Sequence, residues 1–172
     1  RKRPQKAIKT IENLFNKSKN PENIEVVFVF DSDDQDSANE ILKSQIAKTN
    51  NVKHVIVERE NQNFGELYNI GFTKTTHDVV GIIADDLDIQ TNDWDSIILE
   101  KCNMFPDDVY LIAPDDGMRA MATHFFVSRK VVEIMGFLQP PWFVADFGDM
   151  WYTRVFEAVD RFFKLYSVRF IH

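Results

Sequence analysis

Acidic residues gather where two apolar runs of the sequence end. Asp31 follows the run 26–30, and Asp85 and Asp86 follow the run 79–84. Continuous runs rich in Val and Ile are typical of strands that are buried on both faces of a parallel sheet. Ligands of open α/β sheets bind beyond the carboxyl ends of the strands. We therefore expect these carboxylates to lie on one rim of a sheet and to form part of a binding site.

Neighbouring carboxylates repel each other unless a cation or hydrogen-bond donors neutralise them. Oxygen ligands favour Mg²⁺ or Mn²⁺, and Mg²⁺ is typically held by one or two carboxylates together with substrate phosphates. The pattern thus predicts a metal-bound phosphate ester, most simply a nucleotide. The sequence contains neither G-x-x-x-x-G-K-[ST] nor G-x-G-x-x-G, so phosphate binding would depend on the metal and on side chains.

The elements that must position these groups alternate between helix and strand in the first half of the chain. Helical spacing of apolar residues predicts helices at 4–15, 38–46 and 94–102, and a short one after Gly65. Apolar runs predict strands at 24–30, 52–57 and 79–84, and later at 109–113, 123–128 and 163–171. Further helices are expected at 129–135, closed by Gly136, and at 149–160. The alternation predicts βαβ units and an α/β fold: a Rossmann-type mixed, mostly parallel sheet flanked by helices.

Composition limits the classes of partner. The 172 residues carry a net charge of −7, which divides into +6 over residues 1–20 and −13 over the remainder. An acidic body disfavours a dedicated nucleic-acid binder, because the phosphate backbone would be repelled. The apolar runs are far shorter than the ~20 residues needed to span a membrane, so no transmembrane segment is expected. A single cysteine, Cys102, excludes an internal disulfide and favours a reducing, cytoplasmic location.

Several short motifs in this order resemble the nucleotide-sugar half of family-two glycosyltransferases of GT-A fold. They are Arg1-Lys2-Arg3-Pro4, the run ending at Asp31, Asn63-Phe64-Gly65, Tyr68-Asn69-Ile70-Gly71-Phe72, Ile82-Ile83-Ala84-Asp85-Asp86, the segment 124–129, Gly136-Phe137-Leu138 and Phe147-Gly148-Asp149-Met150-Trp151. The resemblance covers nearly the whole chain. It implies one GT-A-like domain over residues 1–172, which we expect to lack its first strand and a C-terminal extension.

The resemblance also implies roles by position. Asp149 would be the catalytic base, with Asp146 as a rival. Asp86 and His172 would hold Mn²⁺ or Mg²⁺, with Asp88 as a rival metal ligand in a second register. Donor-binding roles would fall to Asp31, Asp85, Arg1, Arg3 and Asn69, although Tyr68 stands where the family often has Arg. Candidate acceptor-binding residues are His124, Trp142, Asp116 and Asp146.

These expectations define a metal-dependent, inverting glycosyltransferase. Its donor would be a nucleotide sugar, with a UDP-sugar favoured, and its acceptor a glycan or another hydroxyl compound. The metal offsets charge on the leaving nucleoside diphosphate, while a carboxylate deprotonates the acceptor hydroxyl. Two alternatives stay open. One is a nucleotidyltransferase of related fold, and the other is a non-catalytic nucleotide- or glycan-binding module.

Overall fold

The computed structural model describes residues 2–58, 63–117, 120–143 and 147–172. Within these ranges the strands form two sheets, a pair β1-β2 and a five-stranded sheet in the order β3-β6-β5-β7-β4. The strands are β1 Glu25–Asp31, β2 Asn51–Val57, β3 Val79–Ile82, β4 Asp88–Ile89, β5 Leu111–Asp115, β6 Phe125–Ser128 and β7 Phe162–Ile171.

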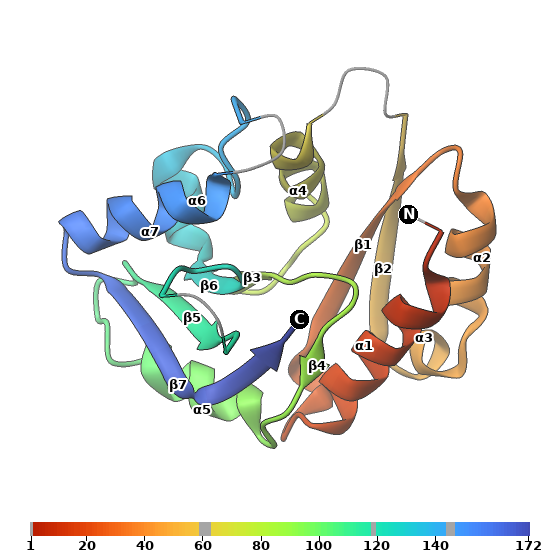
Figure 1. Cartoon of the computed structure of the whole chain (residues 1–172), viewed down its shortest axis with the longest axis horizontal. Coiled ribbons are helices and arrows are strands. Elements are labelled where there is room, and N and C mark those ends of the chain that lie inside the picture. The colour runs from red at the N-terminus through yellow and green to blue at the C-terminus, as the bar shows by residue number, and fades with distance from the viewer. Residues whose placement is uncertain (1, 59–62, 118–119, 144–146) are drawn as a thin grey trace.

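Helices pack against both sheets. They are α1 Pro4–Asn16, α2 Gln35–Lys43, α3 Gln45–Thr49, α4 Phe64–Phe72, α5 Trp94–Cys102, α6 Arg129–Met135 and α7 Gly148–Ala158, with a 3₁₀ turn at Pro21–Asn23. Figure 1 shows α1, α2 and α3 beside the β1-β2 pair, whereas α6 and α7 lie at the far side of the five-stranded sheet. The chain ends near the middle of this view, beside β4.

The expectation of a mostly parallel sheet is wrong. Three of the five strand pairings in the described ranges are antiparallel, namely β3-β6, β5-β6 and β4-β7, and only β1-β2 and β5-β7 are parallel. The reason lies in connection lengths. A parallel neighbour needs a crossover of a dozen or more residues, whereas β5 ends at 115 and β6 begins at 125. This short connection returns β6 antiparallel to β5.

Two further expectations require correction. The strand β1 was expected to be buried on both faces. Taken as whole residues, only Phe30 and Asp31 of it are buried and the other five are half-buried, because the described residues give the strand a single partner. The predicted helix over 38–46 is two helices. Ser44 adopts an extended backbone between them (ψ 152°) and its hydroxyl accepts a hydrogen bond from Ala47 N, which caps α3.

The first helix forms for local reasons and joins the main core. Pro4 occupies its first turn, where a missing backbone N–H costs nothing. Ile11, Leu14 and Phe15 recur at helical spacing and are buried against the core that also contains Trp94. The Trp94 Nε1 donates a hydrogen bond to Leu14 O at 2.9 Å. This packing fixes α1 against the segment that follows β3.

Strand β7 brings the end of the chain back to the same region. It pairs in parallel with β5 up to an irregularity between Pro114 and Asp115, and its last residues pair antiparallel with β4. Irregularities of this kind bend a strand and re-aim its side chains. Ile171 therefore lies opposite Asp88, and His172 follows it.

Candidate functional site

The turn that carries Asp85 and Asp86 is tied to α1 by one buried hydroxyl. Thr10 is 3% exposed, and its Oγ1 accepts a hydrogen bond from Leu87 N at 3.0 Å. The same oxygen lies 3.1 Å from Asp85 O and 3.3 Å from Leu87 O, either of which accepts its proton. The backbone of the turn is thereby held, and the two aspartate side chains project from a fixed position.

Basic side chains surround these two carboxylates. Arg3 spans both, with Nη2 at 2.7 Å from Asp85 Oδ1 and Nη1 at 2.6 Å from Asp86 Oδ2. Lys6 Nζ lies 3.6 Å from Asp86 Oδ2, and His172 Nε2 lies 2.8 Å from Asp86 Oδ1. Burial alone would raise the pKa of Asp86, but the hydrogen bond from His172 and the charges of Arg3 and Lys6 outweigh it and lower the pKa. Asp86 is therefore an anion at neutral pH.

Two further residues border this group. The ring of His124 stands edge-on to that of His172, with centroids 6.3 Å apart. Burial, and secondarily the charge of His172, lower the pKa of His124 to about 4, so its ring is neutral at pH 7. Its Nε2 is buried and has no hydrogen-bond partner among the described residues. Burial, and then the charge of Asp85, raise the pKa of the Tyr68 phenol.

The rival metal residue Asp88 faces different partners. Its Oδ1 accepts a hydrogen bond from Asn13 Nδ2 at 2.9 Å, and its Oδ2 accepts one from Gln90 Nε2 at 3.1 Å. Asp31, at the end of β1, is buried (8% exposed), and its carbonyl accepts a hydrogen bond from Asp34 N. Arg1 and Asp146 lie outside the described residues.

Asn69 fastens a loop to α4. Its Oδ1 accepts hydrogen bonds from Leu138 N and Gln139 N at 2.8 and 2.9 Å, and its Nδ2 donates to Gln139 O at 2.8 Å. Gly65 serves the same junction, since a Cβ there would lie 2.4 Å from Pro140 O. The structure therefore gives the Asn69 side chain a loop-holding position, with three hydrogen bonds to backbone groups.

The expected acceptor residues fall into two places. Asp116 forms a buried ion pair with Lys164, whose Nζ lies 3.3 Å from its Oδ1, and accepts a hydrogen bond from Thr123 Oγ1 at 2.8 Å. Trp142, in contrast, is 57% exposed, and its ring packs edge-on against Phe137 and Trp151 at 5.1 and 5.9 Å. Trp142 thus presents aromatic surface to solvent from a fixed loop.

Asp149 lies in the first turn of α7, the helix that follows this loop. Its Oδ1 accepts a hydrogen bond from Met150 N at 2.7 Å. Thr153 Oγ1 donates to Asp149 O at 2.8 Å and accepts from Ala122 N at 2.9 Å, which links the first turn of α7 to the segment before β6. The preceding Phe147 has a φ of 75°, a left-handed conformation that non-glycine residues adopt rarely and often near functional sites.

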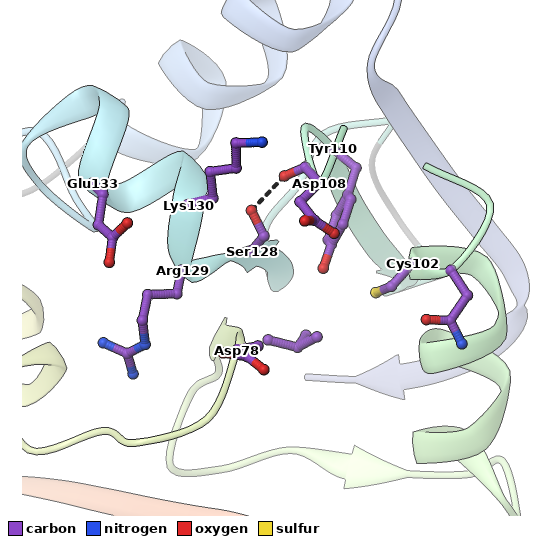
Figure 2. A pocket seen from close by; sticks show the side chains of 10 residues that line it. Asp78, Cys102, Asp108, Tyr110, Ser128, Arg129, Lys130 and Glu133 are labelled. Atoms are coloured by element: carbon purple, nitrogen blue, oxygen red, sulfur yellow. Dashed lines mark hydrogen bonds between the residues drawn. The ribbon is translucent and has the colours of Figure 1, made fainter. Parts of the chain in front are cut away.

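A cavity of about 370 Å³ lies away from these carboxylates, at the opposite end of β3. Figure 2 shows the labelled side chains that line it: Asp78, Cys102, Asp108, Tyr110, Ser128, Arg129, Lys130 and Glu133. Three of its polar side chains already have protein partners. Ser128 Oγ donates to Asp108 O, Lys130 Nζ donates to Asp107 O, and Arg129 donates to His77 O. We therefore assign the candidate site to the rim with Asp85 and Asp86.

Sequence reasoning missed two residues of the site region. Lys6 could have been found, because it lies one helical turn after Arg3 and hence on the same face of α1. Thr10 could not, because its contacts with Asp85 and Leu87 join segments that lie 75 and 77 positions apart in the sequence.

The fold matches a known structure closely. The mannosyltransferase PcManGT from Pyrobaculum calidifontis, solved in complex with GDP-Man and Mn²⁺, is similar with a TM-score of 0.79 at 14% sequence identity. The match covers 99% of this chain and 54% of that chain, so the present chain spans about half of its length. The similarity shows a mixed α/β fold of the GT-A class.

The sequence itself identifies the family. Residues 2–123 match the family described as glycosyl transferase family 2. The matched range exceeds half of the 172 residues, and the chain belongs to this family of glycosyltransferases. No curated protein matches the chain. Among the helices of the described ranges, none is long and apolar enough to cross a membrane.

Proposed function

We propose that the protein is a metal-dependent, inverting glycosyltransferase that moves a sugar from a nucleotide sugar to an acceptor hydroxyl. The observation that carries the proposal is the gathering of Asp85, Asp86, Arg3 and His172 within hydrogen-bond distance at the end of β3. Membership of glycosyltransferase family 2 supports the nucleotide-sugar donor.

The residues at this rim fit Mn²⁺ or Mg²⁺. Asp86 supplies carboxylate oxygens and His172 an imidazole nitrogen, and both groups are ligands that Mn²⁺ accepts. The described residues contain no cluster of three or more acidic, His or Cys groups arranged for a metal. A two-residue site agrees with the usual binding of such ions, in which substrate phosphates and water complete the coordination. When bound, the ion would offset the charge that develops on the leaving diphosphate.

The protein groups have separate tasks in this proposal. Asp86 and His172 hold the ion, with Asp88 as a weaker rival because Asn13 and Gln90 already bond its two oxygens. Asp85 contacts the ribose, and Asp31 contacts the base. Asp149, at the first turn of α7, removes the proton from the acceptor hydroxyl on the face of the sugar opposite the diphosphate. Attack from that face inverts the anomeric centre.

Donor and acceptor are proposed by class. The donor is a nucleoside-diphosphate sugar. Both UDP and GDP should be tested, since the mannosyltransferase of similar fold was solved in complex with GDP-Man. The acceptor is a glycan or another hydroxyl compound. The exposed Trp142 offers a ring on which a sugar could stack, since aromatic side chains bury large apolar faces.

Calorimetric titration of UDP and GDP, each with and without Mn²⁺, tests the proposal. We expect one of them to bind only with the metal, and transfer assays with matching nucleotide sugars to show Mn²⁺-dependent turnover. D86N should abolish metal-dependent binding, whereas D88N should retain it. The reverse pattern would move the metal to Asp88. Binding of neither nucleoside diphosphate by the wild-type protein would overturn the proposal, and metal-dependent binding without any turnover would favour a binding module.

A further inference from the structure

One guanidinium joins the two adjacent carboxylates of the candidate site. Arg3 is the residue immediately before α1, and its two terminal nitrogens lie 2.7 and 2.6 Å from Asp85 Oδ1 and Asp86 Oδ2. The planar fork of arginine suits this two-point contact, which a lysine ammonium cannot reproduce. The contact links residues 82 and 83 positions apart and sets the spacing of the two carboxylates.

The guanidinium occupies the oxygens that a divalent ion would need. Asp86 Oδ2 contacts both Arg3 and Lys6, and Asp86 Oδ1 contacts His172. Two neighbouring carboxylates repel each other, and a nearby cation offsets this repulsion. Arg3 supplies that charge in this structure, so an ion that binds Asp86 must compete with it.

Arg3 is also able to leave. Its side chain is 43% exposed, whereas that of Asp86 is 13% exposed, so the carboxylate is fixed and the arginine has room to turn outward. Its carbonyl accepts hydrogen bonds from Lys6 N and Ala7 N, and these keep its backbone in place. If a diphosphate binds at this rim, as proposed above, a guanidinium that leaves the carboxylates could bind it through two hydrogen bonds.

We propose that Arg3 is a displaceable counter-cation. It holds Asp85 and Asp86 together before the metal and donor bind, and it transfers to the donor diphosphate when they do. This inference rests on the proposed metal and nucleotide site. It gives Arg3 two opposite effects: it weakens binding of the metal alone, and it strengthens binding of the nucleotide once the metal is present.

Variants of Arg3 separate these effects. R3M removes the charge and keeps much of the side-chain volume. We expect R3M to bind Mn²⁺ about three- to tenfold more tightly in the absence of nucleotide, measured by the loss of the free-ion signal in electron paramagnetic resonance. At saturating Mn²⁺ we expect its affinity for the preferred nucleoside diphosphate, measured by calorimetry, to fall about tenfold, which corresponds to 1.4 kcal/mol.

Two controls accompany this variant. K9M removes one positive charge from an exposed position of α1, so it measures the effect of net charge on Mn²⁺ binding and should change it little. R3K keeps the charge but loses the fork, and should lie between the wild type and R3M in both titrations. If R3M fails to fold, which circular dichroism would reveal, R3K replaces it as the test variant.

The outcomes are distinct. Unchanged or weaker Mn²⁺ binding by R3M, with a wild type that does bind Mn²⁺, would overturn the role of Arg3 and leave the proposed function standing. Tighter Mn²⁺ binding without any loss of nucleotide affinity would overturn the transfer to the diphosphate. Absence of Mn²⁺ binding in the wild type and in every variant, both without and with the nucleoside diphosphate, would overturn the metal site itself, and this inference with it.

Discussion

The imidazole of His172 lies 2.8 Å from the carboxylate of Asp86, a residue 86 positions earlier in the chain. Two features of the fold create this contact. The irregular pairing between β5 and β7 directs the end of β7 to β4, and Thr10 holds the backbone of the turn after β3. The candidate metal ligands thus come from two segments that the five-stranded sheet brings together.

Removal of the imidazole should weaken metal binding. We expect H172A to bind Mn²⁺ at least tenfold more weakly in the presence of the nucleoside diphosphate, because one of two protein ligands is lost and Asp86 alone remains. Calorimetry with Mn²⁺ and the nucleotide measures this change. H77A is the matched control, since His77 lies in the turn before β3, away from this rim. Equal Mn²⁺ affinity in H172A and H77A would exclude His172 from the metal site.

Neutralising Asp149 should stop transfer without affecting donor binding. A positioned general base typically contributes 10²- to 10⁴-fold to the rate, so D149N should lose about that factor in kcat. Its Asn side chain can still accept the hydrogen bond from Met150 N, and the helix start should therefore persist. Steady-state transfer rates and nucleotide calorimetry on the same preparations provide the measurement.

Asp160 offers the control for this substitution. It follows the other end of the same helix and has a φ of 56°, a conformation that Asn also tolerates. D160N should transfer at the wild-type rate. Undiminished transfer by D149N would remove Asp149 from the role of base, and Asp146 would then be the residue to substitute.

The sequence was sufficient where the determining signals are local. Pro4 and the spacing of Ile11 and Leu14 predicted α1, and Gly136 predicted the end of α6, where its φ is 80°. Asp85 and Asp86 were singled out because they follow an apolar run, and the structure places them in the turn after β3. These features depend on residues that are close together in the chain.

Strand direction and side-chain partners were not predictable in the same way. The antiparallel direction of β6 depends on which strands pair. The apolar run 125–127 does not indicate it, because such a run is compatible with a parallel or an antiparallel strand. Asn69 bonds Gln139, 70 positions away, and Asp116 pairs with Lys164, 48 positions away. No spacing pattern in the sequence therefore indicated that Asn69 holds a loop or that Asp116 forms a buried ion pair.

The ion pair of Asp116 and Lys164 should contribute strongly to stability. Both side chains are almost fully buried, at 3% and 6% exposure. K164M would leave a buried carboxylate without its cation, and such a loss costs about 3–5 kcal/mol. The double variant D116N/K164M removes the stranded charge, so it should be less destabilised than the sum of its single variants. Urea unfolding of the four proteins yields the coupling energy.

K43M is the control for K164M. It removes an exposed lysine at the end of α2 and should change stability by less than about 0.5 kcal/mol.

The mutant cycle also tests the acceptor role expected for Asp116. If D116N keeps its stability but loses transfer, Asp116 acts on the acceptor. A large loss of stability in K164M with coupling in the cycle would assign the pair to the fold.

Glu25, at the start of β1, makes stability depend on pH. Its carboxylate accepts hydrogen bonds from Lys53 Nζ and from the backbone N and Oγ1 of Thr76, and its side chain is 3% exposed. Burial alone would raise the pKa of Glu25, but these hydrogen bonds outweigh it and hold the pKa below its ordinary value of 4.5. The folded state therefore binds this proton less readily than the unfolded state does.

The sign of the effect follows from that difference. The stabilisation from Glu25 is fully present above about pH 4.5 and is lost as the pH falls through the lowered pKa, because the unfolded state then binds more protons. At pH 7, E25Q should lose about 1–3 kcal/mol, since hydrogen bonds to a charged group are weakened and Lys53 loses its partner. Below pH 4 the free energy of unfolding of the wild type should approach that of E25Q.

Urea unfolding from pH 7 to pH 3 measures the stability of the wild type and of E25Q. E22Q is the exposed control, and its stability should follow that of the wild type throughout. A constant difference between the wild type and E25Q across this range would contradict the assignment.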